Sequence, residues 1–177
     1  MSIARIIRAA DLPAVPWKNG GGTTREIAVW PPGAGMGDFL WRLSMARVEA
    51  AGPFSRFEGV DRVLAVIEGR LRLTGPAMDV ALAADSAPFA FDGAAAVSGE
   101  PLAGAVLDLN AMARRGRYGL HMVHLAPGDI APGTRRSVLL ALEPQRLAGR
   151  ALGRLDCADL SGPVRVEGRA LAVRFTA

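Results

Sequence analysis

The chain has 177 residues, of which 50% are hydrophobic and 21% charged, with a formal net charge of +4. This balance is typical of a globular protein and excludes a largely disordered chain. A single cysteine, Cys157, excludes an internal disulfide and a zinc site built from several thiolates. The basic residues are dispersed, with the densest groups at Arg114–Arg117 and Arg135–Arg136, so we expect no nucleic-acid partner.

The N-terminus does not resemble a signal peptide, because Arg5 and Arg8 interrupt it before any long apolar segment. No apolar run approaches the about 20 residues that a membrane-spanning helix needs. We therefore expect a cytoplasmic protein without a membrane partner.

The first distinctive segment is PWKNGGGTTREIAVW, residues 16–30. Neither G-x-G-x-x-G nor G-x-x-x-x-G-K-[ST] is present, and a strand pattern follows the glycines, so a phosphate-binding loop is excluded. The glycines instead predict a sharp turn with a close backbone approach to a ligand. This turn would bring four polar or aromatic side chains to a pocket: Trp17, Asn19, Thr24 and Glu26.

Strand patterns follow at residues 24–30, 39–48 and 62–67. Glu68-Gly69 predicts a tight hairpin turn, with Leu71 and Leu73 facing inward. Residues 107–115 are expected to form a short helix. Apart from this segment the chain is predicted to be nearly all β.

Two segments repeat at a constant offset. VLAVIE (63–68) is similar to VLLALE (138–143), and DSAPFAFDG (85–93) is similar to DLSGPVRVEG (159–168). An apolar strand then ends each half. The repeat predicts two duplicated antiparallel modules of the jelly-roll type, whose interior is wide enough for one small ligand.

The residue types that carry metal or nucleophilic chemistry are sparse. His121 and His124 lie three apart in a strand pattern and would point to opposite faces, so we expect no metal site. Cys157 lies in an apolar stretch without a nearby histidine and is predicted to be a core residue. No cofactor is expected.

Polar residues also alternate along the predicted strands. Thr24, Glu26 and Ala28 share one face, Arg42 and Ser44 share another, and Arg62 lies on the face of Leu64, Val66 and Glu68. Such a face lies either against solvent or against a polar cavity. The small, paired side chains favour a cavity, in which an arginine needs a carboxylate partner or an anionic ligand. Glu26 would balance one arginine and leave the other to bind the ligand.

Several motifs, which occur in order along the chain, resemble the HutD/Ves family. They are Trp17-Lys18-Asn19-Gly20, Gly22-x-Thr24-x-Glu26-Ile27, Trp41-Arg42-Leu43-Ser44-x-Ala46, Gly52-Pro53-Phe54-Ser55-x-Phe57-x-Gly59-x-Asp61-Arg62, Pro88-Phe89-x-Phe91-x-Gly93 and Asp108-Leu109-Asn110-x-Met112. The resemblance spans residues 12–125 and is looser in the last third of the chain.

The resemblance implies a bicupin, in which two jelly-roll modules pack as one compact unit. Residues 1–115 would form the first module with the ligand pocket, and 116–177 a second, shortened module. It implies a metal-free regulator of histidine utilisation that binds a small carboxylate or a formylated catabolite such as formylglutamate. A homodimer through sheet edges is an expectation from the fold.

Taken together, the sequence predicts a binding protein more readily than an enzyme. The predicted ligand-binding residues are Trp17, Asn19, Thr24, Glu26, Arg42, Ser44, Phe54, Ser55, Arg62 and Phe91. The alternative is an isomerase or hydrolase that acts on such a metabolite with Glu26 as general base.

Overall fold

The computed structural model describes residues 2–133 and 136–177, so Arg135 of the basic pair noted above lies outside the described residues. Throughout these residues the chain is built of strands, with one 3-10 turn at Ala9–Asp11 and no α-helix. No helix in this described part is long and apolar enough to cross a membrane. The predicted all-β class is confirmed.

The chain divides into two compact units. The continuous unit is Pro13–Arg117, and the discontinuous unit combines Met1–Leu12 with Tyr118–Ala177. The sequence placed the first residues with the N-terminal module, but β1 (Ile3–Ile7) pairs antiparallel with β17 (Cys157–Leu160) near the other end of the chain. This long-range pairing assigns the first twelve residues to the discontinuous unit.

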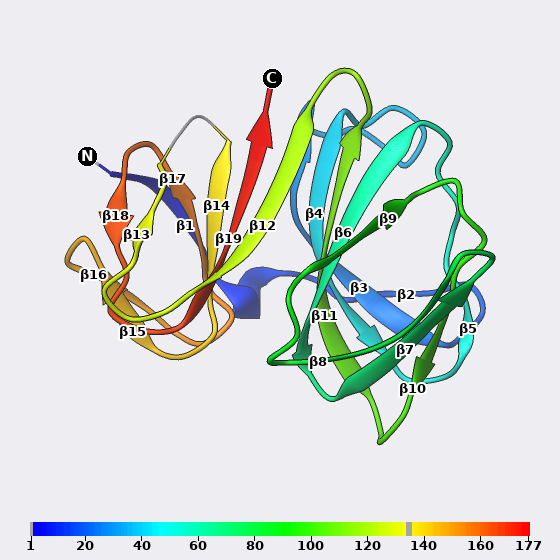
Figure 1. Ribbon diagram of the computed structural model, residues 1–177. Coiled ribbons are helices and arrows are strands. Elements are labelled where there is room, and N and C mark those ends of the chain that lie inside the picture. Colours follow the sequence, from blue (N-terminus) through cyan, green and yellow to red (C-terminus); the bar gives the residue numbers. More distant parts are fainter. Residues whose placement is uncertain (1, 134–135) are drawn as a thin grey trace. The chain divides into compact units, whose positions relative to one another are not determined.

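The continuous unit contains a six-stranded sheet in the order β2-β3-β4-β11-β6-β9 and a four-stranded sheet in the order β5-β10-β7-β8 (Figure 1). Its strands are β2 (Val15–Pro16), β3 (Gly22–Trp30), β4 (Trp41–Val48), β5 (Gly52–Pro53), β6 (Val60–Glu68), β7 (Arg70–Gly75), β8 (Met78–Ala83), β9 (Phe89–Asp92), β10 (Ser98–Pro101) and β11 (Val106–Arg114). All the pairings within these two sheets are antiparallel.

The discontinuous unit contains a five-stranded sheet in the order β1-β17-β14-β19-β12 and two short ribbons, β13-β18 and β15-β16. The remaining strands are β12 (Gly119–Leu125), β13 (Ile130–Ala131), β14 (Ser137–Ala141), β15 (Gln145–Leu147), β16 (Arg150–Leu152), β18 (Val164–Arg165) and β19 (Ala170–Thr176).

The two units share one pattern of pairing. The order β4-β11-β6-β9 corresponds to β12-β19-β14-β17, the pair β5-β10 to β13-β18, and the pair β7-β8 to β15-β16. VLAVIE lies on β6 and VLLALE begins on β14, so these similar segments occupy corresponding strands. The second similarity does not, because it matches β9 with β18, whereas the pairing matches β9 with β17.

Two local predictions are wrong. Gly69 has a positive φ of 84° and Leu71 and Leu73 are fully buried, as expected, but β6 and β7 belong to different sheets. The turn is therefore a corner between sheets, and the hairpin is β7-β8 instead. The predicted helix at 107–115 is strand β11, which pairs with β4 on one side and β6 on the other. Two paired neighbours override the local helical preference.

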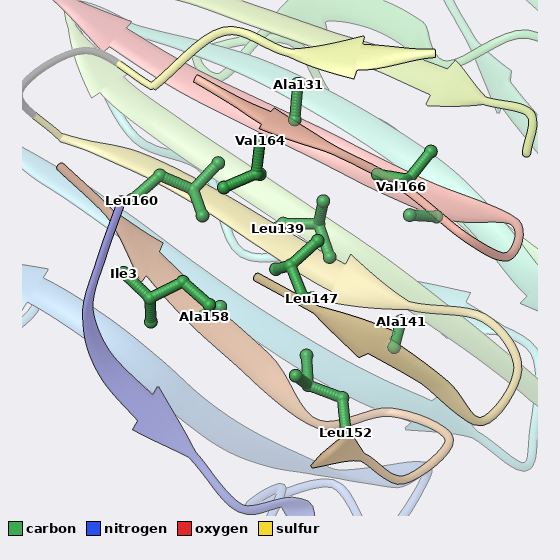
Figure 2. Close-up of a cluster of buried hydrophobic side chains, with 11 residues drawn as sticks. Ile3, Ala131, Leu139, Ala141, Leu147, Leu152, Ala158, Leu160, Val164 and Val166 are labelled. Atoms are coloured by element: carbon green, nitrogen blue, oxygen red, sulfur yellow. The ribbon is translucent and has the colours of Figure 1, made fainter. Parts of the chain in front are cut away.

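The units differ in what fills their interiors. In the discontinuous unit, aliphatic side chains from β1, β14 and β17 gather with those of β15, β16 and β18 (Figure 2). Leu139 and Leu147 at the centre of this cluster are fully buried. In the continuous unit an apolar cluster around Leu64, Leu71 and Leu73 fills only part of the space between its sheets. The remaining part is lined by both apolar and polar side chains.

Candidate ligand-binding site

One face of the six-stranded sheet carries a group of polar side chains. Glu26 on β3 lies opposite Ser44 on β4, and Ser44 lies opposite Asn110 on β11. In the next row, Arg42 lies opposite Met112, which lies opposite Arg62 on β6. Because side chains alternate along a strand, residues paired in this register point to the same side of the sheet.

Two β-bulges change the predicted faces. The register shifts between Glu26 and Ala28, so Val29 rather than Ala28 lies opposite Arg42. A second shift places Glu68 opposite Leu107, away from the face of Arg62. An extra residue in one strand turns the following side chains over, which strict alternation cannot anticipate.

This face borders a cavity of about 1010 Å³ in the continuous unit. Every predicted site residue except Phe91 lines it: Trp17, Asn19, Thr24, Glu26, Arg42, Ser44, Phe54, Ser55 and Arg62. Phe91 lies opposite Arg62 on the neighbouring strand β9, and its ring centroid is 5.0 Å from Cζ of Arg62. The cavity's volume is at the upper end of the range of small-molecule sites.

The triple-glycine segment forms the turn between β2 and β3. Gly20 has a positive φ of 74°, and its N–H donates to the carbonyl of Trp17. A Cβ on Gly22 would clash with the carbonyl oxygen of Arg47, so only glycine allows β3 to approach β4 at this point. The turn carries Trp17, whose indole N–H donates to Oγ1 of Thr24 at 2.7 Å.

Glu26 was predicted to balance one of the two arginines, and the structure pairs it with Arg42. The Nε of Arg42 donates to Oε2 of Glu26 at 2.8 Å, and its Nη1 lies 3.5 Å from Oγ of Ser44. The Arg42 side chain is 12% exposed and that of Glu26 is 44% exposed, so this pair extends from the cavity wall toward solvent. One of the two cavity arginines is thus balanced by a carboxylate.

Arg62 is the other arginine, and it is buried with 6% exposure. Its Nη1 donates to the backbone carbonyl of Ser55 at 3.0 Å, while its Nε has no hydrogen-bond partner among the described residues. The guanidinium lies among three aromatic rings, those of Phe54, Phe57 and Phe91, with Cζ 5.0–5.7 Å from their centroids. Burial lowers the pKa of Arg62 to about 10, so the group stays cationic at neutral pH.

Asp108 and Asn110 are cavity residues that sequence reasoning missed. Asp108 is 1% exposed, and its Oδ1 and that of Asn110 are buried without a hydrogen-bond partner in the described chain. Burial raises the pKa of Asp108 to about 7, and the charge of Arg62 partly opposes this shift. The polar alternation in VLDLNAM was the available signal, but the mistaken helix at 107–115 concealed it.

The candidates for metal or nucleophilic chemistry lie in the discontinuous unit. His121 and His124 are exposed residues of strand β12. The described residues contain no group of three His, Cys, Asp or Glu side chains placed to hold a metal ion. Cys157 is fully buried, as predicted, and burial raises the pKa of its thiol well above the ordinary value, which makes it a poor nucleophile.

Comparison with known proteins identifies relatives along almost the whole chain. The sequence model of the HutD family matches residues 9–171. The "uncharacterized 21.2 kDa protein in hutC 3'region" of Pseudomonas putida is 36% identical, over 99% of this chain and 96% of that protein. Protein Ves of Citrobacter koseri is 39% identical, over 60% of this chain and 56% of its own length.

Solved structures that are similar to this chain include a member of the same family. HutD from Pseudomonas fluorescens SBW25 has a TM-score of 0.88 and 31% identity, with 97% of each chain covered. A conserved protein of unknown function from Pseudomonas aeruginosa PAO1 has a TM-score of 0.83 and 32% identity, with 98% of each chain covered. This chain therefore belongs to the HutD family, which its name links to histidine utilisation.

Proposed function

We propose that this protein is a metal-free bicupin that binds a small carboxylate or formylated catabolite, such as formylglutamate, and thereby modulates histidine utilisation. The ligand would lie in the cavity of the continuous unit. The corresponding pairing of β4–β11 and β12–β19 supports the bicupin architecture, with the apolar interior of the discontinuous unit leaving the binding role to the other module.

The observation that carries the proposal is the state of Arg62. A guanidinium that is 6% exposed loses most of its hydration, and within the described residues Asp108 acts on it electrostatically but forms no direct ion pair with it. Such a buried cation is stabilised when a ligand supplies the opposite charge. Its planar donors match the geometry of a carboxylate.

The neighbours of Arg62 support an organic carboxylate over a bare inorganic anion. Trp17 and Phe54 contact each other edge-to-face, with centroids 6.5 Å apart, and both line the cavity. Aromatic walls bind the carbon skeleton of a ligand while the arginine binds its charge. The Pseudomonas fluorescens HutD structure was determined in a formate condition, and formate is the smallest carboxylate.

Isothermal titration calorimetry with sodium formate and N-formylglutamate tests the proposal. Arg62→Ala should weaken binding of the stronger probe by at least about tenfold, because a charge-assisted bidentate contact is lost. Arg62→Lys keeps the charge but not the fork of donors, and should bind with intermediate affinity.

Arg72→Ala is the matched control, because Arg72 pairs with Asp79 on the exposed side of β7 and β8 in the same unit. It should bind as the unaltered protein does. Unchanged affinity in a folded Arg62→Ala variant would remove Arg62 from the site.

The alternative, an isomerase or hydrolase with Glu26 as general base, has less support. Oε2 of Glu26 accepts a hydrogen bond from Arg42, and the buried carboxyl of the cavity is Asp108 instead. Turnover of N-formylglutamate that is lost in Glu26→Gln would favour the enzyme over the binding protein.

A further inference from the structure

We propose that an anion enters this cavity together with a proton, and that Asp108 is the residue that takes the proton up. This inference rests on the proposed function, because it concerns the same cavity and the same anionic ligand. It adds a residue that sets when the site binds.

Asp108 and a ligand carboxylate would both interact with Arg62. Asp108 on β11 and Arg62 on β6 project from neighbouring strands into one cavity, since Asp108 pairs with Val66 and Arg62 with Met112 on the same face. Each acts electrostatically on the other, as the opposite charge of Arg62 lowers the pKa of Asp108. Arg62 is therefore the balancing charge for the buried carboxylate.

The other charged groups at the cavity are already satisfied or exposed. Arg42, whose charge lowers the pKa of Arg62, pairs with Glu26 at 2.8 Å, and Lys18 is exposed. Both histidines belong to the discontinuous unit. When a ligand carboxylate binds Arg62, two carboxylates then share one buried guanidinium.

Two carboxylates that share one counter-charge in a buried site do not both stay ionised. Asp108 is the one that accepts a proton, because it is 1% exposed, its Oδ1 has no hydrogen-bond partner among the described residues, and burial already raises its pKa to about 7. The proton comes from the solvent buffer, and one O–H bond forms on Asp108. At Arg62 the protein therefore gains one ligand carboxylate and one proton, so the net charge around this arginine does not change.

Calorimetry in paired buffers measures this proton directly. N-formylglutamate is titrated at about pH 8 in two buffers that differ in ionisation enthalpy, and again at about pH 5.5, where its carboxylates remain ionised. Uptake should approach one proton per ligand at the higher pH and fall toward zero at the lower. Affinity should weaken by up to about tenfold per pH unit above about pH 7, because one proton is linked to binding.

Three variants assign the proton. Asp108→Asn should abolish the uptake and bind with an affinity that no longer depends on pH in this range. Glu26→Gln, which alters the other carboxylate of the cavity, should keep the uptake even if affinity changes through Arg42. Asp79→Asn, a surface carboxylate of the same unit, should behave as the unaltered protein.

The outcomes separate this inference from the proposed function. Binding without proton uptake at about pH 8 in the unaltered protein would overturn the inference and leave carboxylate binding intact, whether or not Asp108→Asn folds. Uptake that persists in Asp108→Asn or disappears in Glu26→Gln would overturn the assignment to Asp108. No binding at either pH would overturn the proposed function, and the inference with it.

Discussion

Arg62 and Asp108 bring two charged groups into an interior where burial opposes both charges. Burial lowers the pKa of Arg62 and raises that of Asp108, while each offsets part of the other's cost. A protein that optimised stability alone would place apolar residues there, as the discontinuous unit does around Leu139. At the scale of single residues, the cavity therefore carries the stability cost of two buried, opposite charges.

This cost predicts how stability depends on pH. The pKa of Asp108 is raised in the folded state, so the folded chain binds more protons than the unfolded chain between about pH 4 and pH 7. The free energy of unfolding should fall as pH rises through this window, by on the order of 4 kcal/mol from this residue. Asp108→Asn should match the unaltered protein at about pH 4 and exceed it at about pH 8, in urea unfolding at both pH values.

Asp108→Asn removes a single ionisable group, so the difference between variant and unaltered protein isolates Asp108. If the two proteins lost stability in parallel from pH 4 to pH 8, Asp108 would be ionised in the free cavity throughout this range.

At the scale of elements, the turn between β2 and β3 positions Trp17, one of the aromatic residues that line the cavity. Trp17 donates its backbone N–H to the carbonyl of Gly22 at 2.9 Å, and the N–H of Gly21 donates to Oδ1 of Asn19 at 2.9 Å. Two of the three glycines have different roles in this turn. Gly20 provides a left-handed conformation, and Gly22 provides a close approach to β4.

Gly22→Ala should destabilise the continuous unit by about 1–3 kcal/mol, because its Cβ would meet a backbone oxygen that cannot rotate away. Trp17, Trp30 and Trp41 all belong to this unit, so tryptophan fluorescence during urea unfolding reports on it. Gly37→Ala is the control, since a Cβ there meets nothing within 4 Å and φ is not positive. Equal midpoints for the two variants would mean that β3 can move away from β4 without cost.

At the scale of the whole molecule, the path of the chain makes one unit depend on both ends. Ile3 of β1 joins the apolar cluster of β14 and β17 in Figure 2. Asp156, just before β17, accepts hydrogen bonds from the backbone N–H of Ala9 and from Arg8, at 2.9 and 2.7 Å. Although burial opposes it, these bonds and one from Gly153 lower the pKa of Asp156.

Asp156→Ala should therefore lower the stability of the discontinuous unit by about 2–4 kcal/mol, because several charge-assisted bonds to a buried carboxylate are lost. Far-UV circular dichroism during urea unfolding measures this change. Asp159→Ala removes the exposed ion pair between Asp159 of β17 and Arg5 of β1. This variant should lose less than about 1 kcal/mol of stability. Equal losses would show that β1 is held by sheet pairing alone.

Local patterns in the sequence were sufficient for the strand character of most of the chain, for an ion pair between Glu26 and one of the two arginines, and for the HutD family. Alternation of polar and apolar residues records which strands have two chemically different faces. The motifs from Trp17 to Arg62 indicate the family, because several of them occur in order along the chain. Both kinds of information can be obtained without the fold, because they depend only on the order and spacing of residues along the chain.

Only the tertiary structure decided the rest. The bulges after Glu26 and before Glu68 depend on how a strand fits its partners, and the pairing of β1 with β17 joins residues that lie far apart in the sequence, such as Ile3 and Leu160. Whether a polar face meets solvent or a cavity depends on the second sheet that covers it. The sequence placed Asp108 in a short helix, and only its burial in the same cavity as Arg62 made it a candidate for binding a proton.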